Sequence, residues 1–223
     1  FTGINLVFAG SLSAGAIISC NMLGAKVVAP IKGLITFFAD THIIGGAMAH
    51  TFLLADGIDV GRSLAEPDMI ATARRVTAAA VEAGCKITLP TDVRIAAEFA
   101  ENAPSKAVPV DAIPTGQMAL DIGPKTARAM NLVIAASRTV IWNGPMGAFE
   151  ITPFDTGTNT LALAVAERTQ IGALKSIAGG GDTMAALVHA KAAKDFTYVS
   201  LAGGAFLEWL EGRALPGIEA LRS

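Results

Sequence analysis

Two stretches of the chain end in the same way, and this shared ending constrains the fold more than any other feature. Each begins with a short apolar run typical of a buried strand, Val140–Trp142 in the first stretch and Ile177–Ala178 in the second. Each then breaks into glycines beside one acidic residue, Glu150 in the first and Asp182 in the second. Parallel α/β sheets end their strands in this manner at an edge that binds phosphate groups. The two endings together predict a nucleotide site at the carboxyl edge of a parallel sheet.

The composition agrees with such a sheet. Of the 223 residues, 52% are hydrophobic but only 6% are aromatic, so small aliphatic side chains and glycine supply the apolar mass. That composition suits strands buried on both faces by helices. The formal net charge of −2 argues against a surface for nucleic acid or for an anionic membrane.

Strand-like and helix-like segments alternate along the chain. We expect strands at residues 17–22, 42–44, 86–89, 118–121, 139–142, 176–178 and 197–200, and helices at residues 66–84, 125–136, 154–170, 182–194 and 205–212. Such alternation predicts an α/β fold with an open, mainly parallel, Rossmann-like doubly wound sheet of about six strands and helices on both faces. Residues 91–114 carry Pro104 and Pro109, and we expect a small antiparallel excursion or a surface loop there. No linker divides the chain, so residues 1–223 are expected to form a single nucleotide-binding domain.

Residues 1–25 form an atypical apolar segment without a charged side chain. The segment is long enough to span a bilayer. However, it contains Asn5, Asn21, several serines and four glycines, and it lacks the basic start of a signal peptide. We therefore expect a buried strand and helix rather than a membrane anchor. Because residue 1 is Phe, we also expect the chain to be processed or truncated.

The cysteines and histidines show no metal-binding pattern. Cys20 and Cys85 lie in apolar surroundings without CxxC spacing, which favours reduced core thiols and a cytoplasmic location. The three histidines, at positions 42, 50 and 189, have no repeated spacing and are interpreted as structural or exposed.

The most specific candidate site lies at Gly179–Thr183. The glycines allow the backbone to approach a phosphate group, and the amides of the following helix point toward it. Asp182 can hold a Mg²⁺ ion that bridges phosphate oxygens, and Thr183 adds a hydroxyl. The alternative is a glycine turn in which Asp182 only caps the helix. Three consecutive glycines exceed what a cap needs, so we favour the phosphate site.

The second candidate lies at Trp142–Glu150. Pro145 stands between two glycines and stiffens a turn that presents Asn143. Glu150, just beyond, can accept hydrogen bonds from both hydroxyls of a ribose. A tight turn followed by a solvated glutamate is the alternative, and this segment alone does not favour either.

Three further positions fit the same edge less specifically. Gly45 and Gly46 end another expected strand, and they suit either an adenine ring or close packing of helix on strand. Gly203 and Gly204 precede a helix, where their amides can donate to a moving phosphoryl group. Lys26 follows the first expected strand and is either a phosphate ligand or a surface lysine.

Taken together, these motifs closely resemble the carboxy-terminal, nucleotide-binding half of the phosphoglycerate kinase family, in its bacterial form. The resemblance runs from about Leu23 to the end. The matching stretches occur in the family's order: residues 43–52, 61–64, 120–126, 140–150, 178–183, 199–212 and 215–221. The family transfers a phosphoryl group between 1,3-bisphosphoglycerate and ADP with Mg²⁺, in glycolysis. The resemblance therefore implies a cytoplasmic transferase that binds ADP or ATP.

The resemblance also implies a role for each candidate residue. The phosphates and their Mg²⁺ would be held by Asn143, Gly180, Gly181, Asp182 and Thr183, with Asp182 as the metal contact. The adenine would lie against Gly45, Gly46 and Leu120, and the ribose against Glu150. The transferring phosphoryl group would face Gly203, Gly204 and Lys26. Transfer would then proceed by positioning and charge cancellation, without a covalent intermediate.

The departures from the family set the limits of this expectation. The family's amino-terminal domain, with its basic patch for phosphoglycerate and an arginine that stabilises the transition state, has no counterpart in this sequence. Pro30 stands where the family has a second lysine, and Leu201 and Ala202 stand where it usually has Thr and Gly. We therefore expect a monomer that binds nucleotide and is not catalytically competent alone.

Two other interpretations compete with this one. A degenerate or truncated fragment would bind no nucleotide and would aggregate through an exposed sheet edge. A nicotinamide-dependent dehydrogenase also has strands that end in glycines. It requires G-x-G-x-x-G at the first strand-to-helix turn, and this chain lacks that motif there.

Overall fold

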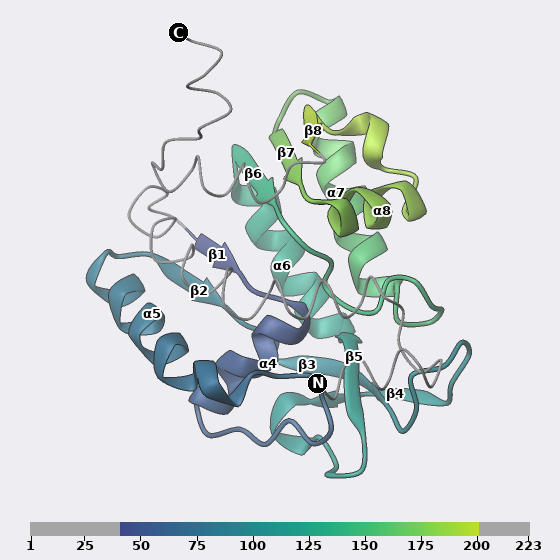
Figure 1. Ribbon diagram of the computed structural model, residues 1–223. Helices are drawn as coiled ribbons and strands as arrows, with labels where there is room; N and C mark the ends of the chain where they lie inside the picture. The colour runs from purple at the N-terminus through teal and green to yellow at the C-terminus, as the bar shows by residue number, and fades with distance from the viewer. Residues whose placement is uncertain (1–40, 201–223) are drawn as a thin grey trace, which may run out of the picture.

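The computed structural model describes residues 41–200 of the chain (Figure 1). Several expectations fall on other residues and so lie outside the described part. They are the apolar segment 1–25, the strand at 17–22, the helix at 205–212, and the site residues Lys26, Gly203 and Gly204.

Strands and helices alternate through most of the described part, as the sequence predicts. The strands are β1 (Thr41–Ile43), β2 (Lys86–Thr88), β3 (Asp92–Ala96), β4 (Ser105–Pro109), β5 (Met118–Ile122), β6 (Thr139–Trp142), β7 (Lys175–Gly179) and β8 (Tyr198–Ser200). The α-helices are α4 (Gly46–Ala55), α5 (Ile70–Glu82), α6 (Pro124–Ala136), α7 (Thr156–Gln170) and α8 (Gly181–His189). Three single turns of 3₁₀ helix complete the list: η1 (Pro67–Met69), η2 (Val110–Ala112) and η3 (Ala193–Asp195).

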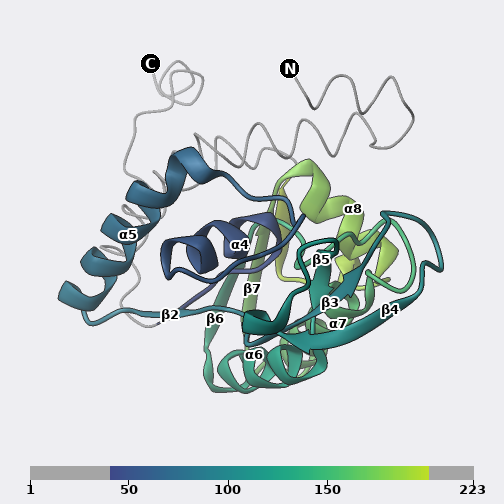
Figure 2. The same cartoon turned by 90° about the horizontal axis from the view of Figure 1, so that it is seen from below.

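The parallel strands form two sheets within the described residues. β1 pairs with β2, and β7 lies between β6 and β8, all in parallel. Helices α4, α5 and α8 lie on one side of these strands and α6 with α7 on the other (Figure 2). The expected α/β class, with parallel strands and helices on both faces, is confirmed.

The antiparallel excursion expected in residues 91–114 is present, and it extends further than expected. β3 pairs antiparallel with β4, as in a hairpin. β3 also pairs antiparallel with β5, which the sequence pattern placed among the parallel strands. β4 and β5 thus flank β3 on its two edges, and both run antiparallel to it.

Helix α6 shows how the local sequence and a distant strand cooperate to start a helix. Pro124 occupies the first turn, where its missing N–H costs no hydrogen bond. The buried side chains of Thr126, Met130 and Ile134 recur every four residues and therefore share one face. The carboxylate of Asp92, at the start of β3, accepts hydrogen bonds from the backbone amides of Lys125 at 3.1 Å and Thr126 at 2.7 Å. This carboxylate satisfies two amides that the helix itself leaves unpaired.

One helix ends earlier than the sequence pattern indicates. The expected helix over residues 182–194 stops at His189, and the turn η3 follows it. Lys191 adopts the left-handed conformation, with φ of 58°. Helices commonly end in this conformation, but the residue is usually glycine. A lysine in that position gives no recognisable signal in the sequence.

The buried apolar side chains form three clusters. The largest lies between α6, α7 and the β6–β8 sheet and includes Met130 and Leu161. A second joins α4 to α5 and includes Phe52 and Val76. A third lies against β3 and includes Ile95. The first two clusters hold the helices that follow β1 and β7, and so position the glycine turns at the ends of those strands.

Candidate functional site at the carboxyl ends of the strands

Three loops meet at the carboxyl ends of β1, β6 and β7. The backbone N–H of Gly46, after β1, donates to the carbonyl of Met146 at 3.0 Å. The N–H of Gly144, after β6, donates to Oγ1 of Thr183, after β7, at 2.7 Å. We refer to these three loops, residues 44–46, 143–147 and 180–183, as the rim. The structure thus brings together most of the residues that the sequence proposed for a nucleotide.

The loop after β7 leaves open space beside the start of α8. Gly180 has a φ of 107°, a conformation that side-chain-bearing residues rarely adopt. A methyl group added at Gly181 would meet no atom of residues 41–200 within 4 Å. Gly180 is the residue that caps α8, and no side chain caps this helix by a hydrogen bond. The structure therefore does not support the alternative in which Asp182 serves as the cap.

Asp182 and Thr183 lie in the first turn of α8 and differ in exposure. Asp182 is partly exposed, and the removal of water around its carboxylate raises its pKa above the usual range. Thr183 is buried, and its hydroxyl oxygen accepts the hydrogen bond from Gly144. Thr183 thus joins two rim loops, whereas Asp182 is the acidic group that solvent can reach.

The loop after β6 is held at both ends by side chains. The indole Nε1 of Trp142 donates to the carbonyl of Gly144 at 2.6 Å. The N–H of Met146 donates to Oγ1 of Thr158, in the first turn of α7, at 3.0 Å. Asn143 is exposed, and its Oδ1 lies 3.2 Å from the position of a Cβ added at Gly180. Asn143 therefore points toward the glycine loop after β7, and its contact with nucleotide phosphates stays a prediction.

Gly45 and Gly46 allow two rim loops to pack closely. A Cβ at Gly45 would lie 2.5 Å from Sδ of Met146, and one at Gly46 would lie 3.1 Å from the carbonyl oxygen of Pro145. Gly46 also has a φ of 59°. Close packing is one of the two readings that the sequence left open for this pair. Contact with an adenine ring stays a prediction.

Leu120 joins the rim from β5. Its carbonyl accepts a hydrogen bond from Ala148 at 2.7 Å, just after the β6 loop. Gly147 is the reason the loop can lie so close, because a Cβ there would fall 2.6 Å from both the Leu120 carbonyl oxygen and Oδ1 of Asp121. The expected adenine-side residue therefore lies beside the loop that carries Asn143.

Glu150 lies at the edge of this arrangement. It is exposed and follows Phe149, whose buried ring makes an edge contact with His189 at a centroid distance of 6.4 Å. No hydrogen bond among residues 41–200 ties the Glu150 side chain to the rim. Its role with a ribose stays a prediction.

Asp121 is a buried carboxylate that the sequence reasoning passed over. Its side chain is almost inaccessible and accepts hydrogen bonds from the amides of Gly157 at 2.7 Å and Ile122 at 2.8 Å. Burial, the largest cause, raises its pKa to about 7, although both hydrogen bonds and Arg94 act in the opposite direction. An aspartate inside an apolar strand and directly before Ile-Gly-Pro was the available signal. By accepting the hydrogen bond from Gly157, the Asp121 carboxylate fixes the start of α7 against β5.

The described part of the chain has no cluster of side chains that could hold a metal ion without a ligand. Within residues 41–200, no group of three or more His, Cys, Asp or Glu side chains is placed to hold a metal ion. Mg²⁺ in phosphotransfer sites is held by one or two carboxylates together with phosphate oxygens and water. Asp182, beside Gly181, is a partly exposed carboxylate of this kind, and its contact with Mg²⁺ stays a prediction.

The remaining titratable and apolar features have structural roles. His50 is buried, its Nδ1 is 2.8 Å from the Leu64 carbonyl oxygen, and burial lowers its pKa. His189 pairs with Asp155 at 3.0 Å. Cys85 is buried. None of the helices in the described ranges has the length and apolar character required to cross a bilayer.

Comparison with known proteins gives one consistent family. A family model described as phosphoglycerate kinase matches residues 18–213. Among curated relatives, the phosphoglycerate kinase of Methylorubrum extorquens (strain PA1) is 55% identical over 202 residues, which are 90% of this chain and 50% of the relative. That of Rhizobium meliloti (strain 1021) is 54% identical over 201 residues, which are 89% of this chain and 50% of the relative. The chain spans about half the length of the curated relatives it matches.

Solved structures agree with the sequence relatives. The chain is similar to phosphoglycerate kinase from Coxiella burnetii, with a TM-score of 0.82 and 39% identity, over 89% of this chain and 50% of that one. It is also similar to the enzyme from Pyrococcus horikoshii OT3, with a TM-score of 0.72 and 26% identity over the same shares. The chain is therefore similar to both enzymes in fold as well as in sequence.

Proposed function

The chain belongs to the phosphoglycerate kinase family, and on that premise we propose that it is the nucleotide-binding half of such an enzyme, taking Mg-ADP or Mg-ATP at the rim. The observation that carries the proposal is the hydrogen bond from Gly144 to Thr183, because it places the β6 loop beside the glycine turn of β7. The carboxyl ends of β6 and β7 thus lie side by side, at the edge of the sheet where α/β folds bind their ligands.

The phosphates take the space beside Gly181. A phosphate group placed there would lie at the N-terminus of α8, near its backbone amides and the partly exposed carboxylate of Asp182. Asn143, which points at Gly180 from the neighbouring loop, lies on the same side. When bound, Mg²⁺ would bridge phosphate oxygens and offset their charge. Asp182 orients the bound nucleotide by holding this ion, and Thr183 keeps the two loops in register.

The base and sugar take the remaining sides of the rim. Gly45, Gly46 and Leu120 line the adenine side, and the exposed Glu150 accepts the ribose hydroxyls. Gly45 packs closely against Met146 and Gly147 against Leu120, so these loops are fixed against one another on this side. The nicotinamide reading is dropped, because the matching family is a kinase family.

We propose that the 223-residue chain does not turn over phosphoglycerate by itself. The resemblance assigns the phosphoglycerate site to the other half of the family's enzymes, and this chain spans about half the length of its relatives. Within the chain, Lys26, Gly203 and Gly204 would contact the moving phosphoryl group. We further propose one domain, a monomer and a cytoplasmic location, in line with a glycolytic family. A coupled kinase assay tests the lack of turnover, and gel filtration tests whether the chain is a monomer.

Isothermal titration with ADP, with and without Mg²⁺, tests the proposed nucleotide site. We expect the wild-type chain to bind ADP more tightly with Mg²⁺, and Asp182→Ala to lose that difference while it still folds. Asp111→Ala is the matched control, because Asp111 is exposed in η2, away from the rim. A folded wild-type chain that binds no ADP would instead support the reading of a non-catalytic fragment.

A further inference from the structure

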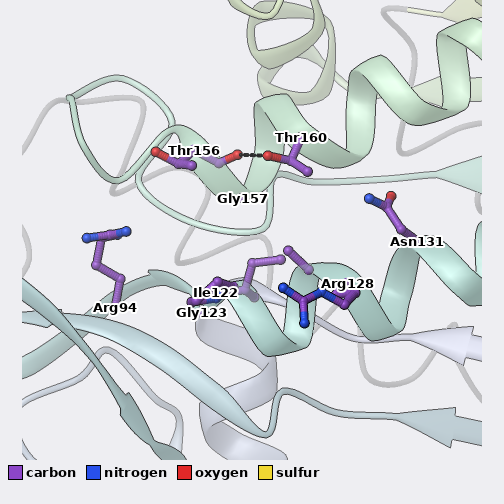
Figure 3. Close-up of a pocket in the computed structure, with 10 residues that line it drawn as sticks. Arg94, Ile122, Gly123, Arg128, Asn131, Thr156, Gly157 and Thr160 are labelled. Carbon is purple, nitrogen blue, oxygen red and sulfur yellow. Dashed lines mark hydrogen bonds between the residues drawn. The ribbon is translucent and has the colours of Figure 1, made fainter.

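A cavity of about 300 Å³ lies apart from the rim, at the base of α6 and α7 (Figure 3). Its wall includes Arg94 from β3, Arg128 and Asn131 from α6, and Thr156 with Thr160 from the first turns of α7. None of the residues assigned to the nucleotide lines it. Its volume is at the lower end of the range for small-molecule sites.

Two arginines face this cavity from opposite sides. Figure 3 shows Arg94 at one side and the guanidinium of Arg128 extending from α6 toward Ile122 and Gly123. Between residues 41 and 200, neither guanidinium forms an ion pair with a carboxylate. Asp121 acts on Arg94 only through space, because its carboxylate oxygens are held by the amides of Gly157 and Ile122. Both positive charges therefore remain available to a ligand.

Two buried polar atoms at the cavity also lack a hydrogen-bond partner in the described part of the chain. They are Nε of Arg94 and Oδ1 of Asn131. The Arg94 guanidinium makes one long contact, from Nη1 to Oγ of Ser105 at 3.3 Å. Nε itself is inaccessible, so a ligand in the cavity can accept only from the terminal nitrogens of Arg94, whose bonding within the described chain is that one long contact. An acceptor placed against Arg94 therefore suits the site.

The backbone amides near the cavity are already occupied, so the site depends on side chains. The first-turn amides of α6 at Lys125 and Thr126 are held by Asp92. The amide of Gly157 is held by Asp121. The hydroxyl of Thr160 donates to the carbonyl of Thr156, the bond drawn in Figure 3. The charged donors left at this cavity are the two guanidinium groups.

The rest of the wall is apolar. Ile122, Pro124 and Ala127 contribute aliphatic surface between the two arginines. A bare inorganic ion would leave this surface without contacts. A short carbon chain that carries an acidic group would cover it and place its oxygens against a guanidinium, which binds carboxylate and phosphate in bidentate fashion.

We propose that this cavity binds a small organic anion, a carboxylate or a phosphate ester of a few carbon atoms, as a second site separate from the nucleotide rim. The inference does not depend on the proposed nucleotide function. Arg128 supplies the exposed charge that meets the ligand first, and Arg94 supplies the deeper donor.

Titration with succinate and with glycerol phosphate, each without nucleotide or Mg²⁺, tests the proposal. We expect at least one of them to bind wild-type chain, and Arg128→Gln to weaken that binding by about 10-fold or more, as expected for a charged hydrogen bond. Arg75→Gln is the matched control, since Arg75 is an exposed arginine on α5 with a single contact to Thr72. Preference for one probe shows whether the acidic group is a carboxylate or a phosphate.

The variant Asp182→Ala separates this site from the rim. We expect it to bind the anion as wild type does, even if its Mg-ADP binding is lost. The proposal is overturned if neither probe binds at millimolar concentration, if Arg75→Gln and Arg128→Gln weaken binding equally, or if Asp182→Ala loses the anion. Inorganic sulfate that binds as tightly as the organic probes would also contradict it, because the apolar wall would then contribute nothing.

Discussion

Replacing Asp121 by asparagine should change how the stability of the chain depends on pH. Asp121 is 4% exposed, and burial raises its pKa from 3.8 to about 7 in the folded chain. Below pH 3.8 the group is protonated in both folded and unfolded chains. As pH rises from there to about 7, the unfolded chain releases this proton before the folded chain does. The free energy of unfolding therefore falls through that window and levels off above it.

The size of the effect follows from the two pKa values. They differ by about 3 units, and each unit corresponds to about 1.4 kcal/mol, so the fall amounts to about 4 kcal/mol in total. Between pH 5 and pH 8 the free energy of unfolding falls by about 3 kcal/mol of this total. Asparagine does not titrate, so Asp121→Asn should escape this fall. Asparagine offers a single acceptor oxygen to the amides of Gly157 and Ile122, a cost that does not depend on pH.

Urea unfolding followed by circular dichroism from pH 5 to pH 8 measures the difference. We expect the free energy of unfolding of Asp121→Asn, relative to wild type, to rise by about 3 kcal/mol across this range. Asp111→Asn, at an exposed site, should follow the wild-type curve. Other titrating groups are common to all three chains and cancel in the comparison. Parallel curves for wild type and Asp121→Asn would refute the reasoning, because they would show that Asp121 is ionised at the same pH in both states.

Three further changes test how the rim is held together and how it binds metal. Gly147→Ala should destabilise the chain by about 1–3 kcal/mol, because the added methyl overlaps backbone atoms of β5, whereas Gly116→Ala, which meets no atom within 4 Å, should be close to neutral in thermal unfolding. Thr183→Val should cost about 1–3 kcal/mol in urea unfolding, because the amide of Gly144 loses its acceptor; an unchanged midpoint would contradict the bond. Mg²⁺-dependent ADP binding should weaken as pH falls, because the raised pKa of Asp182 makes proton and metal compete for its carboxylate; calorimetry at several pH values that shows no such trend would argue against Asp182 as the metal contact.

Local sequence patterns were sufficient for the elements that carry the rim. The strand expected at 139–142 has those bounds in the structure, because an apolar β-branched run is bounded by Arg138 and by the Asn-Gly-Pro turn. The helix expected over residues 66–84 begins as the turn η1 and α5 ends at Glu82, just before Gly84, which adopts the left-handed conformation with φ of 67°. Glycine and proline act on the backbone through their own side-chain chemistry, so their effect can be predicted from the local sequence without knowledge of tertiary contacts.

Structural features that depend on contacts between residues far apart in the sequence could not be predicted in the same way. The antiparallel pairing of β5 with β3 joins strands that β4 separates along the chain, and Lys191 ends α8 in a conformation that the sequence does not announce. The cavity combines Arg94 from an antiparallel strand with Arg128 from a helix, and nothing in the spacing of two single arginines marks them as neighbours. The position of Asp121 in an apolar strand is visible in the sequence, but its hydrogen bond with the distant Gly157 is not.

The most direct test of the nucleotide rim is titration of Gly181→Ala with Mg-ADP beside its melting temperature. A methyl at Gly181 meets no atom of the described chain within 4 Å, so the fold should tolerate it, yet it would occupy the space assigned to the phosphates. We expect an unchanged melting temperature and clearly weaker binding than wild type. Binding equal to that of wild type would show that the phosphates do not lie beside this turn, and would contradict the assignment of the rim.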